Sequence, residues 1–593
     1  MSTKKNYKLP YGNSDFRRIR LENYAYVDKT RFIEMLENEV NPNQFFIRPR
    51  KFGKSLFFMT LLYYYDINYA DQFEQLFGDL YIGQHPTAKK NSYVVMAFDF
   101  SGLDTSNEEE FRFSFASNVC NTVRDFLQQH TKIFPDAEKF IEQIDSTPPN
   151  IGTLEMAFSV AKKAGLKIFV IIDEYDHFAN DLIAMGNLFG KDFYKQVVTA
   201  NGLVRDFYEK LKAATKSSTV DRTFITGVSP VMLDDLTSGY NIADNLSLKL
   251  KYNEMMGFTH QEVEELMNKT GIDANLITIN MDYYYNGYLF HKDGKNKVYN
   301  PSMILYFFKE LLDAGKLPAS VVDPNVNTDY NRIKRLTENG HNRDILIKIA
   351  KEGSIVAQIL PKFSIDQLNN KRYFVSLLFY MGLLTIKESC GEMVRLVVPN
   401  YSIQTVYWEY IQELMYSELP DFDTSDLLNV ISAMFKEGEI ESFIKYVSEN
   451  ILSKLSDHDL QNFDEKYIKL VLMVYLRMSR IYTPMSEYEA VPGRIDLFLQ
   501  SNPRIPEYQY EWILELKYCK TNASPKEIAQ KREEGLEKLN QYLNSDRLKD
   551  RPNLKSALII FIGKNKYKII KNETTKKPKQ SNNKPTRKKS SKK

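Results

Sequence analysis

The chain has 593 residues, a net charge of +3, and 43% hydrophobic and 26% charged residues, a balance typical of soluble globular protein. This length exceeds what one hydrophobic core supports, so we expect about two to four domains. No run approaches the roughly 18 apolar residues of a membrane span, and the lysines near the amino terminus precede no apolar stretch, so neither a membrane segment nor a secretory signal is expected. Three scattered cysteines are too few for a disulfide framework, which favours a reduced, cytoplasmic protein.

Up to residue 255, short apolar strands alternate with helical stretches, a pattern that indicates a parallel α/β domain. The candidate strands are 44–49, 92–100, 167–173 and 222–229. Residues 256–475 are mostly helical in pattern, apart from a hairpin-like stretch at 383–400. The sequence therefore predicts an amino-terminal α/β domain (1–255) and a helical lid or linker region (256–475).

Strands return in residues 476–570, where the predicted order is α-β-β-β-α-β, with the helix at 464–479 counted with this domain. The second helix begins at Ser524, where Pro525 in the first turn and Glu527 complete a capping box. Residues 571–593 hold ten basic residues and one Glu, which leaves a net charge of −6 on the rest of the chain. We expect a disordered basic tail there, which either adds salt-sensitive affinity for nucleic acid or serves as a solubilising or address segment.

The stretch FFIRPRKFGKSLFFMTLLYYY (45–65) contains half of a phosphate-binding pattern. Gly53, Lys54 and Ser55 follow a predicted strand and open an apolar helix, whereas Arg48 stands where the pattern requires a glycine. In such a loop, backbone N–H groups and the helix N-terminus surround the phosphates. Lys54 would then reach the β- and γ-phosphates, and the Ser55 hydroxyl would hold Mg²⁺.

A second acidic motif, KIFVIIDEYD (167–176), is an unbroken apolar run that ends at Asp173 and Glu174. A strand that is apolar on both faces is a buried parallel strand, and open α/β sheets bind ligands at the carboxyl ends of such strands. In an NTPase, Asp173 would hold Mg²⁺ and Glu174 would orient or deprotonate the attacking water. A loop that merely begins with two acids is the alternative, but the spacing of 118 residues from Ser55 favours an NTP site.

Two polar residues, Thr226 and Ser229, lie at the end of the predicted strand 222–229. They could sense the γ-phosphate, and capping of the following loop is an equally good interpretation.

Most of residues 10–305 resemble the family of AAA-ATPase-like P-loop proteins that carry RPR[RK]FGKS, in which the missing first glycine is the rule. The matching segments are YAYVDKTRFIEML (24–36), FDFSGLD, IIDEYD, FITGVSP, GFTHQEV, YNGYLF and VYNPS. The resemblance implies an NTP-binding domain with metal held by Ser55 and Asp173 and water by Glu174. The cofactor-binding residues that it implies are Arg50, Lys51, Phe52, Gly53, Lys54, Ser55 and Asp173.

A second constellation lies near the carboxyl terminus, in WILELKY (512–518). Glu515 and Lys517 are two residues apart and so share one face of a strand that is otherwise apolar on both faces. Burying the two charges costs several kcal/mol unless each has a partner, and a metal shared with Asp496, one hairpin earlier, would supply one. Mg²⁺ suits oxygen ligands and can activate a bound water, while Lys517 orients the nucleophile and stabilises developing charge. A plain Glu–Lys pair on an edge strand is the alternative.

Residues 465–562 resemble the PD-(D/E)XK nuclease superfamily, in the "SE…GR-x-D…ELK" form found fused to the AAA-like module. The resemblance implies Asp496 and Glu515 as metal ligands and Lys517 as the catalytic lysine. Glu487 and Glu465 are weaker candidates for further metal or water contacts. The family helix that follows often reads ALxQIxxxxY, and here Lys538 occupies the position of its glutamine.

Together these motifs predict an α/β multidomain protein with an amino-terminal P-loop NTPase sheet, a helical middle region and a restriction-endonuclease-like domain. The leading hypothesis is an ATP-binding (or other NTP-binding), NTP-gated, Mg²⁺-dependent nuclease that hydrolyses phosphodiester bonds, with DNA favoured over RNA. The alternative is a nucleotide-dependent switch or signalling ATPase whose nuclease-like domain only binds nucleic acid or protein. Nucleic acid is the expected partner, no membrane is expected, and a homo-oligomer is left open.

Overall fold

The computed structural model describes residues 7–185, 188–199, 202–236, 240–318, 320–325, 334, 336–337, 340–418, 424–454, 464–490, 493–502 and 510–571. The chain forms two compact units, Met1–Tyr407 and Trp408–Lys593. The first unit therefore contains the predicted α/β domain together with most of the helical middle region. The basic tail predicted for 571–593 lies, apart from its first residue, outside the described residues, and the boundaries at 255 and 475 remain predictions.

The first unit is built on a five-stranded parallel sheet in the order β2-β3-β4-β1-β5. Its strands are β1 (Asn43–Ile47), β2 (Val94–Asp99), β3 (Ile168–Asp173), β4 (Val220–Gly227) and β5 (Asp244–Asn245). Every residue of β1 and β3 is buried, which explains why β3 reads as an unbroken apolar run up to Asp173, whereas β1 begins with the polar Asn43 and Gln44. The four predicted strands are confirmed, whereas the two-residue β5 is too short to leave a pattern in the sequence.

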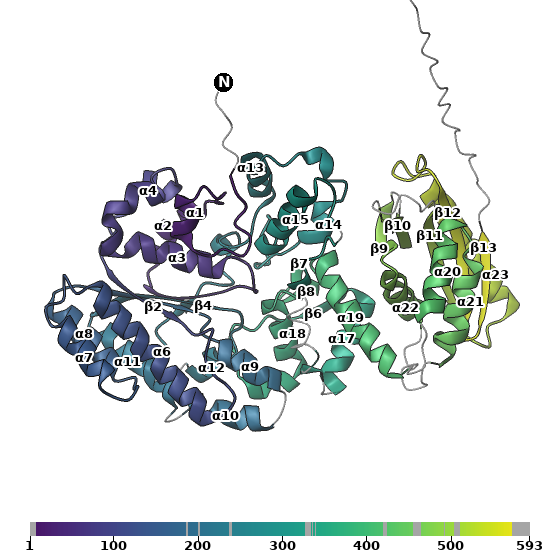
Figure 1. Cartoon of the computed structure of the whole chain (residues 1–593). Helices are drawn as coiled ribbons and strands as arrows, with labels where there is room; N and C mark the ends of the chain where they lie inside the picture. Colours follow the sequence, from purple (N-terminus) through teal and green to yellow (C-terminus); the bar gives the residue numbers. More distant parts are fainter. Residues whose placement is uncertain are drawn as a thin grey trace, which may run out of the picture. The chain divides into compact units, whose positions relative to one another are not determined.

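Helices cover both faces of this sheet (Figure 1). One face carries α1 (Phe16–Leu21), α2 (Arg31–Glu37), α3 (Lys54–Tyr65) and α4 (Phe73–Phe77), and the other α6 (Glu108–Gln129), α7 (Ala137–Asp145), α8 (Thr153–Lys163) and α11 (Leu203–Lys216). The shorter or more peripheral helices of this region are α5 (Tyr81–Gln84), α9 (His177–Met185), α10 (Leu188–Val198) and α12 (Leu233–Leu236). The sheet is thus enclosed, and its ligand-binding edge is formed by the loops that follow its strands.

The rest of the first unit is mostly helical, as predicted. Its helices are α13 (His260–Thr270), α14 (Met281–Tyr285), α15 (Pro301–Ala314), α17 (Gly340–Glu352) and α18 (Lys371–Tyr380), and α19 (Tyr401–Glu418) begins within it. The predicted hairpin at 383–400 is present as β7 (Thr385–Cys390) and β8 (Met393–Val397), which form a small antiparallel sheet with β6 (Ser354–Ala357).

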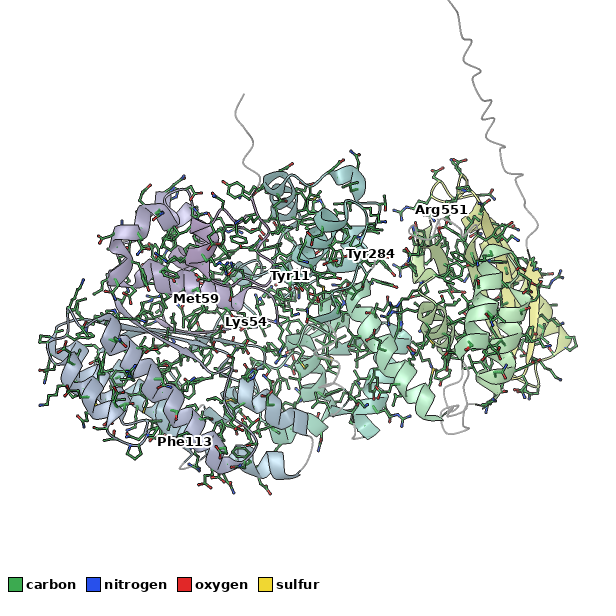
Figure 2. The ribbon with its side chains drawn as sticks, viewed as in Figure 1. Tyr11, Lys54, Met59, Phe113, Tyr284 and Arg551 are labelled. Carbon is green, nitrogen blue, oxygen red and sulfur yellow. The ribbon has the colours of Figure 1, made fainter. Side chains whose placement is uncertain are left out.

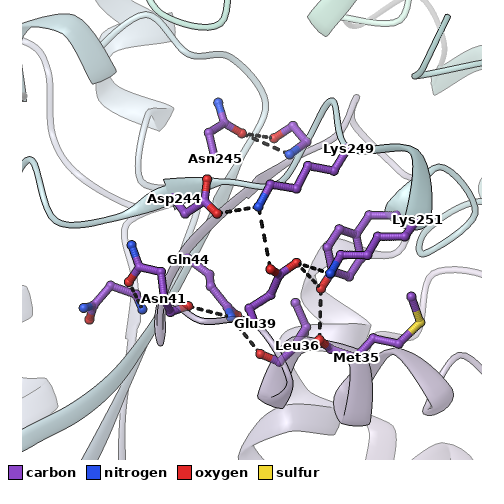
Figure 3. A network of polar contacts seen from close by, with 12 residues as sticks. Met35, Leu36, Glu39, Asn41, Gln44, Asp244, Asn245, Lys249 and Lys251 are labelled. Carbon is purple, nitrogen blue, oxygen red and sulfur yellow. Dashed lines mark hydrogen bonds and ion pairs between the residues drawn. The ribbon is translucent and has the colours of Figure 1, made fainter.

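A polar network joins the end of α2 to the segment 244–252, which begins with the edge strand β5 (Figure 3). Glu39 accepts from Lys251 at 2.7 Å and from the Tyr252 hydroxyl at 2.8 Å, and Lys249 Nζ lies 3.7 Å from the same carboxylate. Lys249 also pairs with Asp244. The network fixes a segment whose backbone carbonyls contact the loop after β1, as described below.

The second unit contains a five-stranded mixed sheet in the order β13-β12-β11-β10-β9. Its strands are β9 (Tyr482–Ala490), β10 (Gly493–Ser501), β11 (Glu511–Cys519), β12 (Leu554–Ile562) and β13 (Lys566–Lys571). Its helices are α20 (Thr424–Lys436), α21 (Glu441–Asn450), α22 (Glu465–Met478) and α23 (Pro525–Leu543). β11 and β12 are parallel and α23 is the crossover between them, so the predicted α-β-β-β-α-β order is confirmed, with β13 as an additional edge strand.

Among the described helices, none combines the length and apolarity needed to cross a membrane.

Candidate functional site

The loop between β1 and α3 has two residues in the left-handed region, Lys51 (φ 64°) and Gly53 (φ 93°). Gly53 is the N-cap of α3, and a side chain there would have open space, so the positive φ rather than crowding explains the glycine. This backbone directs the loop toward the N-terminus of α3, where unpaired N–H groups and the helix dipole favour an anion. The loop backbone is therefore compatible with the predicted phosphate site, which stays a prediction.

Arg48, which replaces the first glycine of the general pattern, is a buried structural residue with 1% exposure. Its guanidinium donates to the carbonyls of Ser247 and Tyr252, both at 2.8 Å, and lies 4.2 and 4.0 Å from the ring centroids of Phe46 and Phe290. Burial lowers the pKa of Arg48 to about 9. The side chain thus points away from the phosphate site and joins the end of β1 to the 247–252 segment.

The middle region of the sequence supports the loop from the other side. Phe52, 1% exposed, makes edge-on contacts with the rings of Tyr288 and Phe290, at 4.9 and 5.6 Å between centroids. Gly382 approaches the loop so closely that a Cβ there would lie 2.8 Å from the Pro49 side chain. The family segments YNGYLF and FGKS, more than 200 residues apart, are therefore packing partners.

Lys54, Ser55, Asp173 and Glu174 converge at this edge of the sheet, as predicted. Lys54 Nζ is buried and donates to the Pro49 carbonyl at 3.2 Å across the loop. Burial raises the pKa of Asp173 to about 6, although a hydrogen bond from Ser55 and the charge of Lys54 act to lower it. Asp173 next to a serine hydroxyl is an oxygen donor pair that suits Mg²⁺.

Two residues that the sequence analysis did not select complete this cluster, His177 and Asp99. His177 lies 3.8 Å from the Glu174 carboxylate and 3.4 Å from that of Asp181. Burial acts to raise the pKa of Glu174, but the hydrogen bond from His177 and the charges of Lys54 and Arg50 lower it to about 2.

Asp99 ends β2 directly opposite Asp173 in the strand register, a position that the predicted strand 92–100 could have indicated.

These residues line a cavity of about 800 Å³. All the predicted loop residues, 50–55, are on its wall together with Asp173 and Glu174. Residues 10–14, 25–27, 29 and 255–258 also line it, so Tyr11 and Lys54, both labelled in Figure 2, belong to the same cavity. The volume falls in the range of cavities that hold a nucleotide-sized ligand.

Thr226 and Ser229 do not line this cavity. The Thr226 hydroxyl donates to the Phe46 carbonyl at 2.7 Å, and the Ser229 hydroxyl donates to the buried Asp176 at 2.9 Å. Asp176 also accepts from the backbone N–H of Ser229. Of the two interpretations drawn from the sequence, the structure favours loop capping over phosphate sensing.

In the second unit, β10 and β11 place Asp496, Glu515 and Lys517 together. Lys517 Nζ donates to Glu515 Oε1 at 2.7 Å, so the two side chains share one strand face as predicted. Asp496 immediately precedes the first β10 residue that pairs with β11, Leu497 opposite Leu514, and its Oδ2 accepts from the Leu516 N–H at 3.0 Å. The strand register therefore brings the three predicted residues to one place.

Glu515 is fully buried, yet among the described residues its second oxygen, Oε2, has no hydrogen-bond partner. Burial, together with the charge of Asp496, raises the pKa of Glu515 to about 7 against the opposing effect of Lys517. An orphaned buried carboxylate oxygen next to a second carboxylate fits a hard cation. In the described part of the chain, no group of three or more His, Cys, Asp or Glu side chains is placed to hold a metal ion. Mg²⁺ is commonly bound through one or two carboxylates and keeps several waters, a donor set that Asp496 and Glu515 fit.

Two neighbouring helices contribute further charges to this centre. Glu465, at the start of α22, lies 3.9 Å from Lys517 Nζ, and burial raises its pKa. Lys538 on α23 lies 3.2 Å from Glu515 Oε1. The side chain of Glu487, on β9, lies outside the described part of the chain.

The comparisons with known proteins match two separate regions of the chain, one around each site. Residues 10–237 match the family described as "Predicted AAA-ATPase", and residues 463–571 match the PD-(D/E)XK nuclease superfamily. The "Uncharacterized protein in vnfD 5'region" of Azotobacter chroococcum mcd 1 is 27% identical over 310 residues, 51% of this chain and 52% of that protein. The chain thus matches about half of the length of this relative.

A Walker-type ATPase of Pyrococcus abyssi is a solved structure with a TM-score of 0.36 and 14% identity, over 64% of this chain and 94% of that one. By the two family matches, the chain carries an AAA-ATPase-like domain and, after it, a domain of the PD-(D/E)XK nuclease superfamily.

Proposed function

We propose that this protein is an NTP-gated, Mg²⁺-dependent nuclease that hydrolyses phosphodiester bonds, with DNA favoured over RNA. The observation that carries the proposal is the unpartnered, buried Oε2 of Glu515 beside Asp496 and Lys517, within a nuclease-superfamily domain. A Glu–Lys pair with a purely structural role would satisfy both carboxylate oxygens.

In this proposal Asp496 and Glu515 would hold Mg²⁺, and a metal bound there would supply an activated water and polarise the phosphate. Lys517 is 5% exposed and is fixed by Glu515 Oε1 and by the Leu516 carbonyl at 2.9 Å. Its ammonium group is therefore oriented before substrate arrives, so it stabilises charge that develops on the phosphate without a reorganisation cost.

The amino-terminal site would bind ATP or another NTP. Gly53 and the N-terminus of α3 would contact the phosphates, Lys54 would leave the Pro49 carbonyl for the β- and γ-phosphates, and Ser55 and Asp173 would hold Mg²⁺. Glu174, with a pKa of about 2, is ionised at neutral pH and would orient or deprotonate the attacking water.

Gating is tested by Lys54→Ala, which removes the proposed phosphate-binding ammonium and changes no residue of the second unit. If NTP binding controls nuclease activity, the ATP effect on cleavage disappears in this variant, while cleavage by a fragment that carries only residues 408–593 does not respond to ATP. Equal responses of wild type and Lys54→Ala to ATP would exclude gating through this site.

Nuclease activity is tested by metal-dependent cleavage of single-stranded, duplex and supercoiled DNA and of RNA, each with and without ATP. The compared proteins are the wild type, the double variant Asp496→Ala/Lys517→Ala, and Lys526→Ala, an exposed lysine on α23, as the charge control. Cleavage by the wild type and by Lys526→Ala, lost in the double variant, supports the proposal. No cleavage on any substrate, with ATP binding intact, would favour the nucleotide-switch alternative.

A further inference from the structure

Helix α23 packs on the sheet of the second unit with one face, and this face determines where Lys538 lies. Gly535, Leu539 and Tyr542 are buried along it. A Cβ on Gly535 would come within 2.4 Å of the Leu558 side chain, and the Tyr542 hydroxyl donates to the Arg494 carbonyl at 2.6 Å. The glycine allows a close approach and the tyrosine fixes the far end, so the helix is held at a defined distance from β11.

This placement brings a second lysine to the same carboxylate oxygen that Lys517 contacts. Lys538 Nζ lies 3.2 Å and Lys517 Nζ 2.7 Å from Glu515 Oε1. The Lys538 side chain is 48% exposed, whereas that of Lys517 is only 5% exposed. Lys517 is therefore confined, while Lys538 has solvent on one side and a flexible stem.

We propose that Lys538 is a substrate-positioning residue of the nuclease centre that alternates between two anions. Without nucleic acid it pairs with Glu515 and weakens the affinity of Asp496 and Glu515 for a divalent cation. With nucleic acid bound, Lys538 contacts a phosphate of the substrate instead. The Glu515 carboxylate is then available to bind the metal. This inference rests on the proposed nuclease function and adds to it that metal and nucleic acid bind cooperatively.

Charge balance supports this assignment. Asp496, Glu515 and Glu465 bring three carboxyl groups to the centre; Lys517 and Lys538 bring ammonium groups to Glu515, and Lys531 brings a third beside Glu465. A divalent cation that approaches Glu515 is repelled by both lysines, and only the exposed one can move away without leaving a buried charge unpaired. A phosphate at the open side offers the displaced ammonium an anion, and by linkage each ligand then raises the affinity for the other.

The first test is calorimetric titration of Mg²⁺ into the full chain without nucleotide or nucleic acid. The part of the binding heat that the wild type gives and Glu515→Gln does not give is assigned to Mg²⁺ binding at this centre. We expect Lys538→Gln to bind Mg²⁺ about tenfold more tightly than wild type, the effect of removing one partly exposed charge a few ångströms from a divalent ion. Lys526→Gln, on the same helix, is the charge-matched control and should bind as wild type.

The second test measures the binding constant for a DNA duplex at several salt concentrations in the presence of Ca²⁺. A gel checks that the duplex stays intact during the measurement. Loss of one phosphate contact should reduce the slope of log K against log salt by about 0.9 in Lys538→Gln and leave it unchanged in Lys526→Gln. Lys538→Arg should retain the wild-type slope, which separates a lost contact from a misfolded helix. An unchanged Mg²⁺ affinity or an unchanged salt slope in Lys538→Gln would overturn the proposal.

These readouts are binding constants, so they separate the two proposals. A wild-type protein that cleaves nucleic acid, with Lys538→Gln unaltered in both titrations, overturns only the role of Lys538. A protein that cleaves nothing, while Lys538→Gln shows both changes, overturns the nuclease function and leaves the cooperative binding of metal and nucleic acid supported.

Discussion

Replacing Arg48 by glycine would restore the first residue of the general phosphate-loop pattern, and we expect it to damage the first unit. The carbonyls of Ser247 and Tyr252 would each lose a charged donor at 2.8 Å. An unsatisfied buried acceptor costs about 1–3 kcal/mol, and the lost contacts with the rings of Phe46 and Phe290 add about 1 kcal/mol. The expected loss in the free energy of unfolding is therefore about 4 kcal/mol.

For a cooperative unit of about 400 residues, this loss corresponds to a fall in melting temperature of about 5 °C. Differential scanning calorimetry of the full chain should show it in the transition that ATP binding stabilises, which identifies the first unit. Arg48→Ala should behave like Arg48→Gly, whereas Arg112→Ala, which removes a half-exposed arginine from α6, should change the melting temperature by less than about 1 °C. An Arg48→Gly protein that melts as the wild type, or that binds ATP more tightly, would refute this role of Arg48.

Four further outcomes follow from the geometry. Glu174→Gln should reduce NTP hydrolysis by about 100-fold or more with NTP affinity retained, and a large loss of binding would contradict its assignment to the attacking water. Because Glu515 has a pKa of about 7 and the metal requires the carboxylate, Mg²⁺ affinity of the second unit should rise about tenfold per pH unit from about pH 5 to 7 and level off above, as calorimetry at several pH values would show. Phe52→Ala should destabilise the first unit by about 3–5 kcal/mol in urea unfolding, because it empties a buried site between two rings. Gly535→Val should lower the stability of the second unit by about 1–3 kcal/mol through its clash with Leu558, and unchanged stability would show that α23 can move outward without cost.

The features predicted well from the sequence are those that depend on the pattern of apolar and polar residues within a single helix or strand. β3 reads as a buried strand because all its residues are apolar up to Asp173. Glu515 and Lys517 are two residues apart on a strand, so both are assigned to one face. The start of α23 follows from the capping signal at Ser524 and from Pro525 in the first turn. The positions of the two candidate sites were therefore predictable within the chain.

The features that were not predicted depend on contacts between distant segments. In the sequence, Arg48 only replaces the glycine of a known pattern. Its role depends on the carbonyls of Ser247 and Tyr252, about 200 residues away, which accept hydrogen bonds from it. Lys538 reads as a departure from a family pattern, although its distance to Glu515 is set by how closely α23 approaches the sheet. Short edge strands such as β5 and β13 gain their order from a neighbouring strand, so their own residues carry little signal.

The support of the phosphate loop by Tyr288, Phe290 and Gly382 has a consequence for how this protein is made. The GKS loop is synthesised early, but the ring partners of Phe52 are added more than 230 residues later, and Gly382, which packs on Pro49, more than 330 residues later. Until then the growing polypeptide has an exposed aromatic side chain and a loop without its packing, and we expect it to be unable to retain nucleotide. Acquisition of ATP would then mark completion of synthesis through about residue 400, and a fragment cut at the end of the ATPase family match, residue 237, would fail to bind it.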